Sequence, residues 1–185
     1  MGKQDLLDAV VADFQASGIG DRSLRDIAAA VGTSHRMLIH HFGSRQGLLT
    51  DVVRRVEAEQ RAFFTSVQVP PEELSRVMWL RLREPAVWPA ERLFFECYAR
   101  AARGEAPYDS LLPGLVDDWL DAFAPADPGD PAAVRARAEA RLSLALFRGL
   151  LLDLVGTEDR GGVDAAFEVY RELEAIAQGF GTAAT

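Results

Sequence analysis

Cysteine is nearly absent from this 185-residue sequence, which has Cys97 alone. A single cysteine excludes an internal disulfide framework and is typical of proteins in a reducing compartment. No run approaches the roughly 20 apolar residues of a membrane-spanning helix, and no secretion-signal segment follows Met1. We therefore expect a cytoplasmic protein with no membrane partner.

Alternating strand patterns, internal repeats and phosphate-cradling glycine-rich loops are also missing. The helical periods that remain predict an all-α fold. All three histidines lie between residues 35 and 41, and no two are spaced i, i+4. A zinc or di-iron site in the C-terminal part therefore lacks its ligands, and we expect no metal and no cofactor.

The most informative segment runs from Ser23 to Leu49. Its first part places apolar residues at the spacing of a buried helix face, with Ser23 as cap and Asp26 completing a capping box. Gly32 then allows a sharp turn, and Ser34 caps a second short helix. Two short helices joined in this way predict a helix-turn-helix, whose second helix enters the major groove of DNA.

This region resembles the DNA-binding domain of the TetR family of bacterial transcriptional repressors over about residues 6–56. The matching segments are LLDAVVADFQASG, SLRDIAAAVGTSHRMLIHHF and GSRQGLL, in the family's order and spacing. The resemblance implies that residues 33–37 face the groove, while Leu38 and Phe42 belong to the core. One departure concerns Ile39, where the family usually has a tyrosine that reaches a phosphate. That contact is then missing, or is supplied by His40, Ser44 or Arg45.

Arg36 is the leading candidate base reader, because the chain has no asparagine and 19 of its 20 basic residues are arginine. Ser44 and Arg45 begin the next predicted helix, where backbone N–H groups and a cation suit a phosphate. A solvated arginine there remains an alternative. The candidate DNA-binding residues are Ser23, Arg25, Thr33, Ser34, His35, Arg36, Met37, Ile39, His40, Ser44 and Arg45.

The net charge of −8 is unevenly distributed. Residues 1–61 contain eight basic and eight acidic residues, whereas the remainder contains twelve basic and twenty acidic ones. Only the first part is therefore suited to approach phosphate, and its affinity would come from a few placed contacts doubled by dimerisation.

We assign residues 1–44 to a three-helix DNA-binding domain and residues 45–185 to a connecting helix plus a regulatory and dimerisation domain. The connecting helix is predicted to run to about Ser66, and Pro70-Pro71 is the strongest break after it. Further helices are predicted over 71–83, in ERLFFECYARAARG, in LLPGLVDDWLDAF, and over about 131–155 and 163–180.

The predicted helix over 131–155 is apolar at nearly every position from Leu142 to Val155 and must be covered on most sides. The family resemblance implies that the last two helices pair with their symmetry mates as a four-helix bundle. A core helix of a monomer is the alternative. The candidate dimer-interface residues are Leu142, Leu146, Gly149, Leu150, Asp153, Phe167, Tyr170 and Leu173.

Aromatic residues gather in the C-terminal part, where the resemblance implies an inducer pocket for a small apolar or amphipathic effector. Such pockets combine aromatic walls with a few polar anchors, although each residue could instead be plain core. The candidate pocket residues are Met78, Trp79, Trp88, Arg92, Phe94, Phe95, Tyr98, Trp119, Phe123 and Phe147.

A competing pattern is Asp117-Asp118-Trp119-Leu120-Asp121, which spells the DDxxD signature of Mg²⁺-dependent terpene synthases. The chain is short for such an enzyme and has no second metal motif, so an acidic helix surface explains it as well. We expect a non-enzymatic, homodimeric, ligand-responsive repressor on a palindromic operator. An activator or global DNA binder without an effector is the alternative.

Overall fold

A computed structural model describes residues 2–17 and 22–182, with the backbone alone described for 177–182. Helices and short 3₁₀ turns make up its secondary structure, and the described residues contain no strand. This agrees with the all-α prediction. The helices are α1 (Lys3–Ser17), α2 (Leu24–Ala30), α3 (His35–Phe42), α4 (Arg45–Ser66), α5 (Pro71–Leu82), α6 (Trp88–Ala102), α7 (Leu112–Phe123), α8 (Pro131–Thr157) and α9 (Arg160–Thr182), with 3₁₀ turns η1 (Pro85–Val87) and η2 (Tyr108–Leu111).

The helix-turn-helix forms at the predicted caps. The Asp26 amide donates to Ser23 Oγ (3.3 Å) and the Ser23 amide donates to Asp26 Oδ2 (3.0 Å), which completes the capping box of α2. Gly32 has φ +68° in the turn, and Ser34 Oγ accepts from the Met37 amide (3.2 Å) to begin α3. The sequence also predicts that Gly18, the last residue of LLDAVVADFQASG, ends the first helix, but Gly18 lies outside the described residues.

The junction from α3 to α4 depends on a close backbone approach. Ser44 caps α4 by accepting from the Gly47 amide at 2.9 Å. A Cβ on Gly47 would lie 2.2 Å from the Phe42 carbonyl oxygen, far inside contact distance. A larger residue at position 47 would therefore push α3 and α4 apart.

The later helices follow the predicted order with shifted ends. The structure begins α6 at Trp88, three residues before the predicted segment ERLFFECYARAARG, with Pro89 in the first turn, where a proline is tolerated. Helix α8 continues to Thr157, and α9 begins at Arg160 rather than near Val163. Pro71 occupies the first turn of α5, as predicted.

Two hydrophobic clusters hold the chain together. The first joins the faces of α1–α4 to α6 and η2, through residues such as Leu48, Phe94 and Leu111. The second joins α4, α5, α7, α8 and α9 around Trp79 and Phe167. The first cluster crosses the predicted boundary at residue 44, so the DNA-binding unit and the larger part share buried contacts.

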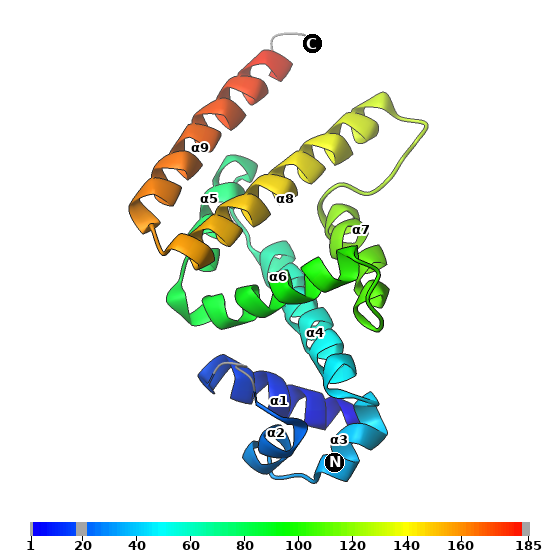
Figure 1. Ribbon diagram of the computed structural model, residues 1–185. Helices are drawn as coiled ribbons and strands as arrows, with labels where there is room; N and C mark the ends of the chain where they lie inside the picture. The colour runs from blue at the N-terminus through cyan, green and yellow to red at the C-terminus, as the bar shows by residue number, and fades with distance from the viewer. Residues whose placement is uncertain (1, 18–21, 183–185) are drawn as a thin grey trace.

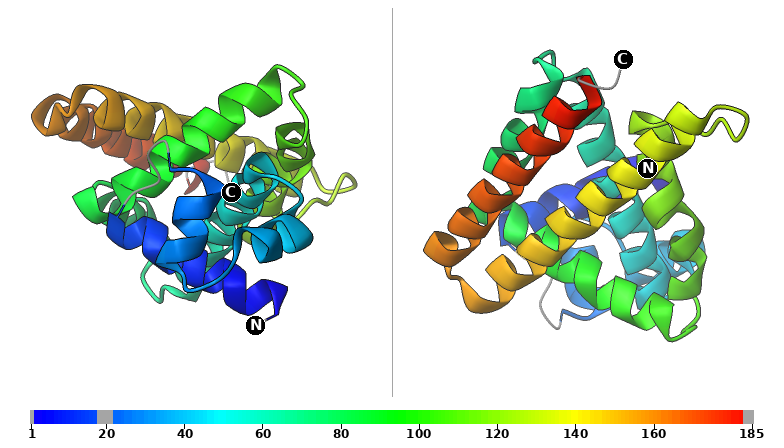
Figure 2. Two further views of the ribbon diagram at one scale, coloured as in Figure 1. Left: turned by 60° about the horizontal axis from the view of Figure 1, so that its bottom comes forward. Right: turned by 90° about the horizontal axis from the view of Figure 1, so that it is seen from above.

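Helices α1–α3 lie at one end of the molecule and α8 and α9 toward the other, with α4 running between the two parts (Figure 1). Seen from above, α8 and α9 lie on the side facing the viewer (Figure 2, right). Helix α4 thus links the helix-turn-helix to the helices of the C-terminal part.

Candidate functional site

Helix α3 has one buried apolar face and one exposed, largely polar face. Leu38 and Phe42 are buried against the first hydrophobic cluster, which fixes the rotation of this two-turn helix. His35, Arg36 and Met37 are consequently exposed in its first turn. An imidazole, a guanidinium and a thioether at the start of this helix suit contact with base edges.

The other predicted DNA-contact residues fall into three groups. Arg25, Ile39 and His40 are exposed, and Thr33 and Ser44 are half-buried. Ser23 is exposed, but its hydroxyl donates to Asp26 Oδ2 at 2.7 Å. These hydrogen bonds hold the pKa of Asp26 below its usual range.

Arg45 has a structural contact that the sequence did not indicate. Its Nε donates to the Arg22 carbonyl oxygen at 2.9 Å, and its side chain is half-buried. This bond ties the start of α4 to the segment before α2. Arg45 therefore helps to place the helix-turn-helix, in addition to the phosphate contact that we predicted.

A cavity of about 200 Å³ lies among α4, α5, α6, α7, α8 and α9. Its walls are largely apolar, and 20 residues from these helices line it. Five of the predicted pocket residues are among them: Met78, Phe94, Trp119, Phe123 and Phe147.

The other five predicted pocket residues do not line this cavity. Trp79 is buried, stacks on Phe167 and donates from Nε1 to Asp164 (2.9 Å). Trp88 donates to the Arg83 carbonyl oxygen (3.3 Å). Trp79 and Trp88 thus have structural partners for their indole N–H groups.

Arg92, predicted as an anchor for an anionic ligand, instead binds the end of α8. Its guanidinium donates to the Val155 carbonyl oxygen (3.1 Å) and pairs with Glu158 (3.1 Å). Phe95 and Tyr98 pack against Phe94 outside the cavity. Arg92, Phe95 and Tyr98 therefore do not line the cavity, contrary to the prediction.

A polar group borders the cavity on the side of α4, and none of its charged residues was among the predicted pocket residues. Glu57 Oε2 accepts from Trp119 Nε1 (2.8 Å) and pairs with Arg148 Nη2 (3.4 Å). Gln60 Nε2 donates to Glu91 Oε1 (2.7 Å). Burial raises the pKa of Glu57 and raises that of Glu91 to about 7, while burial lowers the pKa of Arg148.

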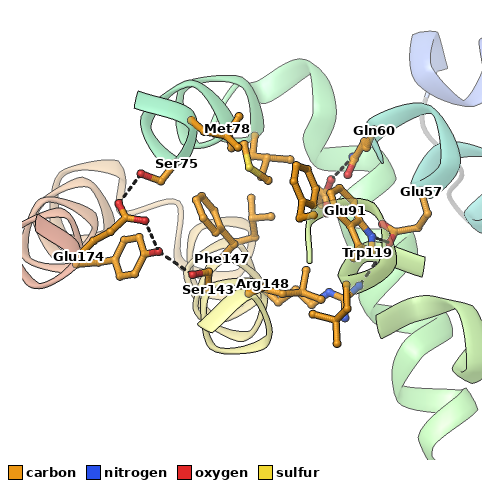
Figure 3. A pocket seen from close by; sticks show the side chains of 18 of the residues that line it. Glu57, Gln60, Ser75, Met78, Glu91, Trp119, Ser143, Phe147, Arg148 and Glu174 are labelled. Atoms are coloured by element: carbon orange, nitrogen blue, oxygen red, sulfur yellow. Dashed lines mark hydrogen bonds and ion pairs between the residues drawn. The ribbon is translucent and has the colours of Figure 1, made fainter. Parts of the chain in front are cut away.

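A second polar group lies on the opposite side of the cavity, with Met78 and Phe147 between the two (Figure 3). Glu174 accepts from Ser75 Oγ (2.8 Å) and from the Tyr170 hydroxyl (3.1 Å). Ser143 Oγ lies 2.9 Å from the same hydroxyl. The cavity therefore has an apolar middle and a polar group at each side.

Glu57 and Glu91 were not among the predicted pocket residues, although their positions in the sequence mark them. Glu57 lies four residues after the buried Val53, and Glu91 lies three residues before the buried Phe94. Both carboxylates therefore occupy positions on the apolar stripe of a helix, where charge is rare unless it is paired or functional.

The outer face of α8 and α9 carries exposed apolar side chains. Leu142 is 67% exposed and Leu173 61% exposed, and a Cβ on Gly149 would meet open space. Among the side chains that the structure describes, the exposed large apolar ones are Val134, Leu142 and Leu152 on α8 and Val169, Leu173 and Ile176 on α9. Water contact on this scale is unusual for a surface with no partner.

Three predicted interface residues lie elsewhere. Phe167 is 1% exposed and packs inside the subunit, so it cannot reach a second copy. Tyr170 is half-buried and lines the cavity. Leu150 packs against the second hydrophobic cluster, whereas Leu146 is half-buried and Asp153 exposed.

The DDxxD carboxylates are paired with arginines. Asp118 lies 3.0 Å from Arg61, and Asp121 lies 2.7 Å from Arg137. Asp117 lies 3.6 Å from Arg137 as well. These ion pairs fasten α7 to α4 and α8, which accounts for the acidic pattern structurally.

The remaining candidate chemistry is limited. Cys97 is buried, and burial raises the pKa of its thiol to about 12, so it is protonated at neutral pH. Within residues 2–17 and 22–182, no His, Cys, Asp and Glu side chains gather as a metal site. In the same part of the chain, no helix is long and apolar enough to span a membrane.

The helix-turn-helix region is similar in sequence to known regulatory proteins. Residues 3–52 match the family model described as bacterial regulatory proteins, tetR family. The match covers the helix-turn-helix and the start of α4, so this part of the chain is similar to the DNA-binding region of that family. It is 33% identical over 92 residues to the HTH-type transcriptional regulatory protein RaaS of Mycobacterium tuberculosis, an alignment that covers 50% of this chain and 37% of that protein.

The full fold is similar to solved structures at low sequence identity. A TetR-family transcriptional regulator from Pectobacterium atrosepticum superposes with a TM-score of 0.63 at 24% identity, covering 92% of this chain and 90% of the other. Salmonella enterica GusR gives a TM-score of 0.61 at 16% identity, covering 91% and 92%. The shared fold therefore extends beyond the region that the family model matches.

Proposed function

We propose that the protein is a ligand-responsive transcriptional repressor that binds a palindromic DNA operator as a homodimer. The observation that carries the proposal is the exposed first turn of α3, held by the buried Leu38 and Phe42. The family match of residues 3–52 and the cavity beside α4 support it.

DNA contact is expected through α3 in the major groove. Arg36 would read guanine through two hydrogen bonds, and His35 and Met37 would contact neighbouring base edges. Exposed Arg25 and His40, with the N-terminal amides of α4, would contact phosphates. Ile39 provides an apolar contact in place of the tyrosine hydroxyl.

Dimerisation is expected through the outer face of α8 and α9. Pairing two copies would bury the apolar side chains around Leu142 and Leu173 and place two α3 helices for half-sites one helical turn apart. Gly149 would let the paired backbones approach closely, because its missing Cβ leaves space.

Ligand response is expected to pass through α4. This single 22-residue helix begins at the α3 junction and brings Glu57 and Gln60 to the cavity, about 20 Å further along its axis. A ligand that fits the cavity better in one orientation of α4 would shift the population of that orientation. The two α3 helices of a dimer would then no longer match their half-sites.

The test begins with selection of DNA fragments from a random pool by the purified protein. We expect a palindromic consensus, bound by two subunits, with affinity that falls steeply with salt. Light scattering of the free protein should give a dimer at micromolar concentration. Recovery of no consensus sequence, or binding that ignores sequence, would contradict the proposal.

A further inference from the structure

We propose that the cavity binds a small amphipathic organic cation, with its ammonium group beside Glu91 and its apolar body between Met78 and Phe147. This inference rests on the proposed ligand response, and it specifies the class of effector. It starts from the charges on the cavity wall. Three carboxylates, Glu57, Glu91 and Glu174, line the cavity together with a single guanidinium, Arg148.

Arg148 is already committed to one of these carboxylates. It pairs with Glu57 at 3.4 Å and donates to the Leu115 carbonyl oxygen. Its guanidinium also lies over the Phe94 ring, 5.0 Å from the centroid. An incoming anion would therefore have to displace existing partners of Arg148 and approach three acidic groups.

Glu91 is the carboxylate with the fewest partners. It is 4% exposed, accepts a hydrogen bond from Gln60, and forms no ion pair within the part of the chain that the structure describes. Because a buried carboxylate without a cation is costly, its pKa rises to about 7. A cation delivered into the cavity would offset that cost directly.

The remaining walls suit the rest of such a molecule. Phe94, Trp119, Phe123 and Phe147 present aromatic rings, and ring faces attract ammonium groups as well as apolar ones. Figure 3 shows Met78 and Phe147 between the Glu91 group and the Glu174 group. A cavity of about 200 Å³ limits the ligand to roughly a single ring with a short chain.

Three probes of equal skeleton separate the charge classes: 3-phenylpropylamine, 3-phenyl-1-propanol and 3-phenylpropanoate. We would measure their binding to the full chain by calorimetry at pH 7.5. We expect the amine to bind about tenfold or more tightly than the alcohol, and the carboxylate to bind weakest.

The variant E91Q keeps the shape and the Gln60 contact but removes the charge. We expect it to reduce the preference for the amine by about tenfold while leaving the alcohol unchanged or slightly tighter. E96Q is the matched control, because Glu96 lies on the same helix, exposed and paired with Arg100 at 3.2 Å. It should leave all three affinities unchanged.

The proposal would be overturned if the alcohol or the carboxylate bound as tightly as the amine or more tightly, or if no probe bound. It would also be overturned if E91Q kept the preference for the amine. A separate measurement tests the proposed function: fluorescence anisotropy monitors whether each probe releases the selected DNA from the protein. Amine binding without DNA release would leave the cation site standing and remove the ligand response. DNA release by the neutral or anionic probe alone would support the ligand response and exclude the cation site.

Discussion

Arg148 Nη2 lies 3.4 Å from Glu57 Oε2, so one ion pair joins α8 to the connecting helix α4 at the wall of the cavity. Both side chains are largely buried, and Trp119 donates to the same carboxylate oxygen. The helix that carries the exposed apolar face is thereby linked to the helix that leads to the helix-turn-helix.

Removing one partner of this pair should be costly. Arg148→Ala leaves Glu57 buried beside the indole N–H alone, and we expect a loss of about 3–5 kcal/mol in the free energy of unfolding. Urea denaturation followed by circular dichroism measures it. Arg141→Ala is the control, since its exposed pair with Asp117 at 3.8 Å should contribute about 0–1 kcal/mol. Equal losses in the two variants would contradict this account.

The raised pKa of Glu91 makes stability depend on pH. Glu91 titrates near 4.5 when unfolded and about 7 when folded, so the folded state holds the extra proton between these values. Stability should therefore fall as the pH rises from about 4.5 to 7, by about 3 kcal/mol for this group alone. Glu57 on α4 and Arg148 on α8 are the charged groups that face it.

Glu91→Gln should remove this contribution. We expect the variant to match the parent near pH 4.5 and to exceed its stability at pH 8, because no charge has to be buried. Thermal unfolding across this pH range gives the comparison, with Glu96→Gln as the exposed control. Parallel curves for Glu91→Gln and the parent would show that Glu91 does not titrate between folded and unfolded states.

Gly47→Ala should disturb the α3–α4 junction. The added methyl group would meet the Phe42 carbonyl oxygen at 2.2 Å, and the required shift should cost about 1–3 kcal/mol. DNA affinity should fall further than stability alone explains, because α3 moves relative to α4. Gly156→Ala is the control in α8, where the new methyl group meets open space. Both are measured by denaturation and by DNA titration.

Arg36→Ala should reduce DNA binding by roughly 1–3 kcal/mol per half-site and relax sequence preference at one position. Titration of the selected operator against single-base variants measures both effects. Arg76→Ala, exposed on α5 and remote from α3, should change neither. A uniform loss across all sequences would identify Arg36 as a phosphate contact.

Leu142→Glu should separate the dimer into helical monomers. Leu142 is 67% exposed in the subunit, so the change should alter monomer stability by only about 0.5 kcal/mol. Leu150→Glu, by contrast, places a charge against the second hydrophobic cluster and should unfold the chain. Light scattering with circular dichroism distinguishes the two. A Leu142→Glu protein that remains dimeric would exclude this face as the interface.

Local features of the fold could be read from the sequence because short-range chemistry decides them. The caps at Ser23, Ser34 and Ser44 and the turn at Gly32 each depend on residues within a few positions of one another. The buried residues of α1, including Leu6 and Phe14, likewise recur at the spacing of one helix face, which can be read from the sequence. The helix-turn-helix was therefore predictable almost residue by residue.

The cavity was decided by tertiary structure. Glu57, Glu91 and Glu174 are far apart in the chain, and only the packing of α4, α6 and α9 brings them to one space. The same packing turns Phe167 into the subunit core and commits Arg92 to the end of α8. Periodicity shows that a residue lies on a helix face, but which helix covers that face depends on contacts between residues distant in sequence. Such contacts between distant residues determine both the exposed apolar face of α8 and α9 and the charge of the cavity.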